Sequence, residues 1–433
     1  MKIPLEPLRG FRDILAPDST TLRHLMSLFR ELVESYGYEE VIPPTLERFE
    51  LFAIKSGEEI RRSMFVFRDK AGREVALRPE ATASIARIYL KHLRAKPKPL
   101  RLYYIVNCFR YEEPQRARYR EFWQAGIELL GAEGKVADIE TINLLINYYE
   151  KIKMLDKIVL KIGNIGIYRS MFKHFGLADE EQDHILHLMD KSMYDEALSH
   201  LEQRGFNELA NKLQELWTTN TIEEAAKILS TINKEAEKQA EYLIEITNII
   251  RDIYPNLALE PDISFARGLA YYTGIIFEVK VPGFPVSIAG GGRYDNLIEI
   301  YGDEHVPGVG FAIGLDRTLA ALKEKGINLG IERREKATIV LIDEKYTSYA
   351  IKLQQLLTSK HVVTDITTSS RISKTLQKIY EKGTRYAIIV GEKEAKENKV
   401  TIKNLESRKQ VVVQLDRLKK VEKLSNIFEQ KQI

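Results

Sequence analysis

Hydrophobic residues recur at helical spacing near the start of the chain. From about Ser19 to Tyr36 a leucine, methionine, phenylalanine or valine returns every three or four positions, which predicts an amphipathic helix. Asp18 or Ser19 can cap its first turn, and Gly37 ends it. The next stretch, Glu39–Pro44, is predicted to be extended and closes with two prolines, which a sheet tolerates only at an edge or a strand end.

Strand patterns follow further along the chain. Glu74–Leu77 is predicted as a short strand and Ala81–His92 as a helix. Two longer strands, Leu102–Glu112 and Glu121–Leu130, are joined by a loop with the sequence EPQRARYR. In the second of these strands, alternation places Trp123, Ala125, Ile127 and Leu129 on one face and Phe122, Gln124, Gly126 and Glu128 on the other.

The polar face of that strand can be explained in two ways. Alternation by itself is typical of a strand with one face in solvent. This face carries few charges, however, and Gly126 would leave room for a ligand to lie on the sheet. These two features favour a binding floor.

A helical segment interrupts the strands between about residues 168 and 254. Apolar positions at helical spacing recur there, for example in Ala225–Ile232 and Ala240–Ile253, and strand patterns are few. We therefore expect a helical insert. His184 and His187 have a spacing that can bind a metal, but no third ligand is near them in the sequence, so no metal site is predicted.

The remainder of the chain returns to strands and then alternates. Strands are predicted at Ile275–Val281, Pro285–Ala289 and Val309–Ile313, then a helix at Asp316–Lys325 and a charged linker at Glu332–Lys336. Because strands and helices alternate after the linker, a small α/β domain with a mostly parallel sheet is predicted. Its strands are Thr338–Ile342, Val362–Ile366, Tyr386–Val390, Lys399–Ile402 and Gln410–Gln414, and its helices are Thr347–Ser359 and Ser373–Lys382.

Composition narrows the class of protein. The 433 residues are 44% hydrophobic and 29% charged, which excludes wholesale disorder, and the length suits roughly two to four domains. Cys108 is the single cysteine, so an internal disulfide framework and a cysteine-based zinc cluster are excluded. The first residues lack the apolar core of a signal peptide, and no apolar run approaches the roughly 18 residues that span a bilayer. We expect a soluble cytoplasmic protein with no membrane partner.

Charge is divided unevenly along the chain. Residues 337–433 hold 19 Lys and Arg against 11 Asp and Glu, a net charge of +8, whereas the rest of the chain has a net charge of −5. A basic module favours a polyanion such as a nucleic acid as its partner. From charge alone, a solvated surface of Lys and Glu, as in Gly391–Lys399, is an equally good explanation.

Glycine and arginine residues carry the candidate chemistry. The run Ala289–Asp295 could let a ligand approach the backbone closely, Gly308–Gly314 has the wrong spacing for a dinucleotide fingerprint, and no P-loop motif is present. Five arginines lie beside strand, turn or glycine signals, and a guanidinium suits phosphate or carboxylate. They are Arg78, Arg110, Arg118, Arg267 and Arg317. Each alone is more typical of a structural ion pair, but together they favour a polyphosphate site.

Several segments have informative sequences. They are RGFRD and GYEEVIPP near the start, ALRPEATASIAR at Ala76–Arg87, FRYEEPQRARYREFWQAGIELLG at Phe109–Gly131, ARGLAYYTG at Ala266–Gly274, AGGGRYDNL at Ala289–Leu297 and GVGFAIGLDR at Gly308–Arg317. In this order they resemble the histidyl-tRNA synthetases, a family of class II aminoacyl-tRNA synthetases, over nearly the whole chain. GYEEVIPP, the Phe109 segment and the Gly308 segment resemble class II motifs 1, 2 and 3, which are degenerate. ARGLAYYTG and AGGGRYDNL resemble two segments of the histidine enzymes, and together they are highly specific.

The resemblance implies a fold and an activity. The fold is an α+β catalytic domain at residues 1–330 with a mixed, mainly antiparallel class II sheet, interrupted by the insert at about 168–254, and an α/β anticodon-binding domain at 337–433. The activity is histidine–tRNA ligation, in which ATP activates L-histidine to histidyl-adenylate and the histidyl group passes to the 3′ end of tRNA(His). A homodimer formed through motif 1 and Mg²⁺ accompanying ATP are also implied, without identified protein ligands for the metal.

The resemblance also implies roles for individual residues. Arg110 and Arg267 would be catalytic, with Arg110 on the α-phosphate and Arg267 as the cationic electrophile that replaces a metal, because fixed cations stabilise charge developing on phosphoryl oxygens. The ATP-binding set is Arg110, Glu112, Arg118, Phe122 and Arg317, the last at the γ-phosphate. The histidine-binding set, whose carboxylates suit the ammonium and whose hydroxyls suit a ring nitrogen, is Glu80, Thr82, Gln124, Glu128, Tyr271, Tyr272 and Tyr294.

Two positions depart from the family pattern. Ala270 stands where the signature usually has Asp, a change that concerns the orientation of the neighbouring tyrosines and not the arginine itself. Glu113 precedes Pro114 where the motif 2 loop usually has Arg-Pro, and a carboxylate does not bind phosphate. A contact with the tRNA acceptor stem is therefore expected from Arg116 or Arg118.

Two alternatives use a related catalytic fold. The regulatory subunit of ATP phosphoribosyltransferase lacks the anticodon-binding domain and usually loses the substrate arginines, whereas this chain keeps Arg110, Arg267 and Arg317 and has a basic α/β tail. Another class II enzyme, such as a prolyl or threonyl synthetase, would lack Arg267–Gly274 as written. The sequence therefore favours the histidine enzyme.

Overall fold

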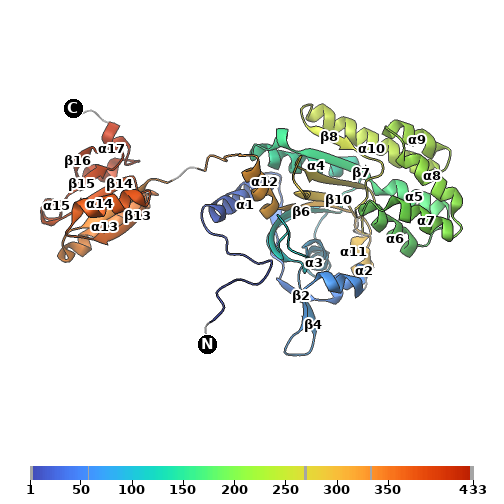
Figure 1. Cartoon of the computed structure of the whole chain (residues 1–433), viewed down its shortest axis with the longest axis horizontal. Helices are drawn as coiled ribbons and strands as arrows, with labels where there is room; N and C mark the ends of the chain where they lie inside the picture. Colours follow the sequence, from blue (N-terminus) through green and yellow to red (C-terminus); the bar gives the residue numbers. More distant parts are fainter. Residues whose placement is uncertain (1–2, 57, 268–270, 332–333, 430–433) are drawn as a thin grey trace. The chain divides into compact units, whose positions relative to one another are not determined.

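The computed structural model describes residues 3–56, 58–267, 271–331 and 334–429. The chain divides into two compact units, Met1–Leu329 and Gly330–Ile433, each with its own hydrophobic core (Figure 1). In the part of the chain that is described, no helix has the length and apolar character needed to cross a lipid bilayer.

An eight-stranded sheet forms the centre of the first unit. Its order is β1 (Glu39–Glu40), β5 (Leu100–Phe109), β6 (Glu121–Leu130), β11 (Gly308–Gly314), β10 (Ala289–Arg293), β9 (Ile275–Lys280), β7 (Val159–Asn164) and β8 (Ala258–Pro261). The two outer pairs, β1–β5 and β7–β8, are parallel, and the inner pairs are antiparallel. The prediction of a mixed, mainly antiparallel sheet is therefore confirmed.

Helices and a small second sheet surround these strands. The helices of this part are α1 (Asp18–Ser35), α2 (Glu50–Ser56), α3 (Thr82–Ile88), α4 (Gly134–Lys151), α11 (Leu297–Gly302) and α12 (Leu315–Glu324), with short turns η1 (Glu58–Ser63), η2 (Tyr89–Leu93) and η3 (Leu155–Lys157). The small sheet has the order β2 (Leu46–Arg48), β4 (Glu74–Leu77) and β3 (Val66–Arg68). The predicted apolar stripe of α1 is buried, as Leu25, Phe29 and Val33 show, and it packs against α4 and α12.

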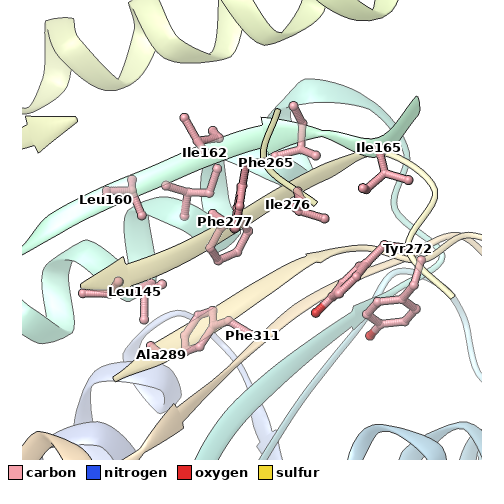
Figure 2. Packing of buried hydrophobic residues seen from close by; sticks show 14 of the residues in the cluster. Leu145, Leu160, Ile162, Ile165, Phe265, Tyr272, Ile276, Phe277, Ala289 and Phe311 are labelled. Atoms are coloured by element: carbon pink, nitrogen blue, oxygen red, sulfur yellow. The ribbon is translucent and has the colours of Figure 1, made fainter. Parts of the chain in front are cut away.

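Six consecutive helices form the insert and gather at one end of the unit (Figure 1). They are α5 (Ile165–His174), α6 (Asp179–Asp190), α7 (Tyr194–Gln203), α8 (Asn207–Trp217), α9 (Ile222–Ser230) and α10 (Lys234–Ile253). Their buried residues, such as Phe172 and Leu243, belong to the same hydrophobic cluster as those of α1 and the sheet. Figure 2 shows part of this cluster, where Leu160 and Phe277 of the sheet lie near Leu145 of α4.

The glycine run forms a strand, which corrects one prediction. A strand was expected at Pro285–Ala289, but β10 begins at Ala289 and contains Gly290, Gly291 and Gly292. Glycine is unfavourable in most strands. It is required here because a Cβ at Gly291 would stand 2.7 Å from Cβ of Phe311 and 2.8 Å from the ring of Phe277 on the neighbouring strands.

The second unit is an α/β fold around a five-stranded sheet. Its elements are β12 (Lys336–Leu341), η4 (Glu344–Tyr346), α13 (Thr347–Ser359), β13 (Val363–Thr368), α14 (Ile372–Glu381), β14 (Tyr386–Val390), α15 (Glu392–Lys396), β15 (Lys399–Asn404), β16 (Gln410–Gln414), α16 (Leu415–Lys420) and α17 (Asn426–Glu429). The order is β13–β12–β14–β15–β16, with the first two pairings parallel and the last two antiparallel. The expected mostly parallel sheet is thus half antiparallel, because β15 and β16 each pair with the strand that precedes them in the chain, and the short helix α15 between β14 and β15 does not make a parallel crossover. Of the predicted linker, Glu332 and Arg333 lie outside the described residues, and Lys336 already begins β12.

Candidate active site

A cavity of about 140 Å³ lies on the face of the sheet formed by β6, β10 and β11. Its lining includes the whole predicted histidine-binding set together with four residues expected at ATP, namely Glu80, Thr82, Gln124, Glu128, Tyr271, Tyr272, Tyr294, Arg110, Phe122, Arg267 and Arg317. A smaller neighbouring pocket shares Arg110, Phe122 and Arg317 and adds Glu112 and Arg118. The structure therefore brings both predicted sets together.

Three arginines point their guanidinium groups into one end of the cavity. Nε of Arg110 donates to the Pro79 carbonyl at 3.1 Å, Nη1 of Arg267 to the Phe277 carbonyl at 3.1 Å, and Nη1 of Arg317 to the Ser287 carbonyl at 2.9 Å. Backbone carbonyls thus hold them in place. Among the residues that the structure describes, no carboxylate lies within ion-pair distance of these three groups.

The electrostatics of this end indicate an anion site. Burial, followed by the positive charges of Arg110 and Arg118, lowers the pKa of Arg317 to about 10. Guanidinium groups that repel one another in a partly dry cavity are stabilised when a polyanion binds between them. Phe122 adds an aromatic face, since the guanidinium carbon of Arg110 lies 5.3 Å from its ring centroid.

The loop between β5 and β6 forms the rim of this end. Arg118 lies 3.9 Å from Glu112, so the two form at most a loose pair. Arg116, the other residue expected to contact the tRNA acceptor stem, is exposed and pairs with Glu324 at 2.6 Å. Glu113 pairs with Arg9 at 2.7 Å, also on the surface. Arg118 also lines the smaller pocket.

Two buried carboxylates also line the cavity. Glu128 accepts a hydrogen bond from Oγ1 of Thr82 at 2.8 Å and another from the hydroxyl of Tyr294. Burial raises the pKa of Glu128 to about 8, and these hydrogen bonds only partly oppose the rise. The carboxylate of Glu80 accepts from the backbone N–H groups of Thr82 and Ala83 at the start of α3, and burial raises its pKa as well. A cationic ligand would relieve both carboxylates.

Aromatic rings also line the cavity. The ring centroids of Tyr271 and Tyr272 are 4.9 Å apart, and those of Tyr271 and Tyr294 are 5.9 Å apart in an edge-on arrangement. Figure 2 shows Tyr272 beside the strands of the sheet. Ala270, the departure from the family signature, lies outside the described residues.

Gln124 contributes an amide to the cavity floor. Its side-chain oxygen lies 3.2 Å from Sγ of Cys108, which is fully buried. Burial raises the pKa of the Cys108 thiol to about 12. The thiol therefore stays protonated at neutral pH and donates to the amide oxygen, which leaves the amide nitrogen of Gln124 for other partners.

Glycines on β10 and β11 make room for the functional side chains. A Cβ at Gly290 would stand 2.5 Å from Cζ of Arg267, and a Cβ at Gly310 would stand 3.0 Å from Cδ of Glu128 and overlap its carboxylate. The expectation for the Ala289–Asp295 run was a close approach of a ligand to the backbone. In the structure a protein guanidinium makes that close approach.

Tyr104 is a cavity residue that sequence reasoning missed. A Cβ at Gly126 would stand 2.5 Å from the ring and hydroxyl of Tyr104, which arrives from the neighbouring strand β5. The expectation that Gly126 leaves room for a ligand is therefore wrong, because Tyr104 fills that space. The pairing of Tyr104 with Gly126 across β5 and β6 depends on strand register, which the sequence pattern did not give.

Arg78 does not belong to the arginine cluster. It is 3% exposed and donates from Nε and Nη2 to the backbone and side-chain oxygens of Asn107 at 2.7 and 2.9 Å, and from Nη1 to the Pro43 carbonyl at 2.7 Å. Its role is to fasten the segment after β1 to β5. The inclusion of Arg78 in a polyphosphate site is corrected, because its donors are already satisfied by the fold.

The insert histidines lie against one another's rings. His184 contacts His200 of the next helix, with ring centroids 4.7 Å apart and planes tilted by 55°. No group of three or more His, Cys, Asp or Glu side chains suited to a metal ion occurs among the residues described.

The cavity and the fold can be compared with known proteins. The family model described as histidyl-tRNA synthetase matches residues 10–318, more than two thirds of the chain. The chain belongs to this family. A second model, described as an anticodon binding domain, matches residues 336–424 of the synthetase.

Relatives match the synthetase over nearly its full length. A histidine–tRNA ligase of Sulfolobus acidocaldarius is 42% identical over 422 residues, which cover 96% of this chain and 98% of the relative. A histidine–tRNA ligase of Metallosphaera sedula is 43% identical over 426 residues, with coverage of 97% and 98%. The crystal structure of apo S. aureus histidyl-tRNA synthetase has a TM-score of 0.73 at 28% identity and covers 97% of this chain and 99% of its own. The synthetase is therefore an aminoacyl-tRNA ligase by family, and the regulatory-subunit alternative is not favoured.

Proposed function

We propose that the protein activates L-histidine with ATP to histidyl-adenylate in this cavity and then transfers the histidyl group to the 3′ end of tRNA(His). One observation carries the proposal. A single cavity is lined by guanidinium groups without a carboxylate partner among the described residues and by two buried carboxylates. Such a cavity complements a triphosphate and a cationic amino acid bound side by side.

The first step is an in-line displacement at the α-phosphorus of ATP. A carboxylate oxygen of histidine forms the new P–O bond, and the bond to the leaving pyrophosphate breaks. Arg110 and Arg267 are assigned to the α-phosphate oxygens, where negative charge builds up, and Arg317 to the γ-phosphate. Fixed cations that need no reorganisation lower the barrier of such a step.

The carboxylate end is assigned to the amino acid. Glu80 and Thr82 take the ammonium group, and Glu128 and Tyr271 take the imidazole, with Gln124, Tyr272 and Tyr294 completing the pocket. Hydrogen bonds to a polar ring discriminate strongly, because an apolar side chain of similar size would offer the buried carboxyl group of Glu128 no hydrogen bond.

Transfer to tRNA completes the reaction. A hydroxyl of the 3′-terminal ribose attacks the carbonyl carbon of histidyl-adenylate, and AMP leaves. The second unit, whose residues 337–433 carry a net charge of +8, is assigned to the anticodon end, since phosphate neutralisation favours a basic surface. Mg²⁺ is proposed to arrive on the ATP phosphates, because the described residues offer no cluster of ligands for a metal ion.

A homodimer in the cytoplasm is the proposed working form. Apolar residues of the motif 1 region support a dimer, since Ile42 is 78% exposed and Leu15 is 75% exposed. Ile42 follows β1, an edge strand of the large sheet. Exposed apolar groups beside an open sheet edge are typical of a surface that a partner covers.

ATP–pyrophosphate exchange tests the proposed function. Purified protein is incubated with ATP, labelled pyrophosphate and each amino acid of a panel, and exchange is expected with histidine alone. The matched control is Arg267→Ala, which is expected to lose exchange while it retains part of the ATP affinity. Exchange with another amino acid, or none with histidine, would overturn the assignment.

A further inference from the structure

The segment before α1 lies against the ATP end of the cavity. Its residues Arg9–Asp13 form neither helix nor strand, yet their backbone meets the loop between β5 and β6. The N–H of Arg120 donates to the carbonyl of Gly10 at 2.9 Å, and the N–H of Arg110 donates to the carbonyl of Arg120 at 2.9 Å. The segment is therefore linked by hydrogen bonds to the backbone of a proposed catalytic arginine.

Arg12 makes the deepest polar contact of this segment. Its guanidinium pairs with the carboxylate of Asp316, which is 2% exposed, and its Cζ lies 3.6 Å from the ring centroid of Tyr119. The other carboxylate oxygen of Asp316 accepts from the backbone N–H of Trp123 at 2.5 Å. Asp316 thus joins the segment before α1 to the first turn of α12 and to β6.

The position of Asp316 beside the proposed ATP site makes its ion pair with Arg12 relevant to ATP binding. Asp316 and Tyr119 line the same outer pocket as Arg118 and Arg317. A buried carboxylate without a cationic partner is costly, and beside these arginines it would weaken their positive potential or draw one of them away. Arg12 supplies the neutralising charge from outside the cluster.

We propose that Arg12 is a positioning residue for ATP. By pairing with Asp316 and stacking on Tyr119, it holds the loop between β5 and β6 in place and keeps Arg317 available to the triphosphate. This inference rests on the proposed ATP site. The histidine end is expected to be spared, because Glu80 and Glu128 bind other groups.

Exchange kinetics with separate KM values for ATP and histidine test the inference. Arg12→Ala is expected to raise the KM for ATP about tenfold, as loss of a charged hydrogen bond implies, and to leave the KM for histidine within about twofold. Adding Asp316→Asn should recover much of the ATP affinity, because it removes the unpaired charge. Arg12→Lys should lie between wild type and Arg12→Ala, because lysine keeps the charge and loses the planar stack.

Arg9→Ala serves as the control variant for Arg12→Ala. Arg9→Ala removes an ion pair whose side chains are 72% and 69% exposed, so both KM values should stay unchanged. Equal rises of both KM values in Arg12→Ala, or an unchanged KM for ATP, would overturn the positioning role. If Arg12→Ala does not fold, Arg12→Lys and the Arg12→Ala/Asp316→Asn double variant decide by the same split. Absence of histidine-dependent exchange in the wild type would instead refute the proposed function.

Discussion

Replacing Gly290 of β10 with alanine is expected to displace and so disable the guanidinium of Arg267, which precedes β9 in the chain. An added Cβ would overlap Nη1 of the Arg267 guanidinium and stand 2.5 Å from its Cζ. Nonbonded atoms of this kind settle about 3.5 Å apart, so Nη1 must retreat by roughly 2 Å. The hydrogen bond from its Nη1 to the Phe277 carbonyl, now 3.1 Å, would be strained or lost.

This displacement sets the size of the expected effect. A misplacement of only about 1 Å in a group that stabilises the transition state already costs about 100-fold in rate, or about 2.7 kcal/mol of barrier. The kcat of histidine-dependent exchange should therefore fall at least about 100-fold. The KM for histidine and the unfolding temperature should change little, because the clash is with the far end of a flexible side chain.

A double variant tests whether Gly290→Ala lowers activity through displacement of Arg267. Arg267→Ala should nearly abolish adenylate formation, and Gly290→Ala in that background should cost nothing more if it acts through Arg267. Exchange kinetics of the two single variants and the double variant provide the comparison. Full activity in Gly290→Ala, or a further large loss in the double variant, would refute the reasoning.

Three further predictions concern other parts of the chain. Burial raises the pKa of Glu128 from its ordinary value near 4.5 to about 8, so between these pH values the folded state binds a proton that the unfolded state releases. The contribution of Glu128 to stability is therefore greatest below pH 4.5 and is lost as the pH rises through 8. The unfolding temperature of the ligand-free protein should fall over this pH range, and Glu128→Gln should make the fall smaller. Deleting residues 337–433 should weaken tRNA charging far more than amino-acid activation. Equal losses of both activities would contradict the assignment of tRNA binding to the second unit and of activation to the first. Ile42→Asp should convert a dimer to a monomer in light scattering, whereas a wild-type monomer would exclude the proposed dimer.

Local patterns were sufficient for much of the fold. The strand Glu121–Leu130 and the helix Thr347–Ser359 were predicted with the bounds that the structure has, because strong periodicity and clear flanking residues agree there. The polar face of β6 also indicated a binding floor, and Gln124 and Glu128 do line the cavity. Side-chain chemistry on one strand is visible in the sequence because alternation alone decides which residues share a face.

Features that depend on neighbouring strands could not be read in the same way. The glycines of β10 look like a loop until Phe277 and Phe311 are known to crowd them. Tyr104 occupies the space over Gly126, and Arg78 is satisfied by Asn107 and Pro43, through contacts that depend on register and long-range packing. The pair of Arg12 with Asp316 joins residues 304 positions apart. Sequence spacing carries no information about such a contact.

The insert helices share one hydrophobic core with the catalytic sheet, which limits whether the insert can be removed. Tyr168 and Phe172 of α5 and Ile246 of α10 are fully buried in the cluster that also contains Leu160 and Phe277 of the sheet. Excising the insert would expose the parts of β7, β8 and β9 that α5 and α10 cover, so the insert cannot be removed without uncovering the core of the catalytic unit. Amide hydrogens of α10 should exchange as slowly as those of β7, because both open only when the whole unit unfolds.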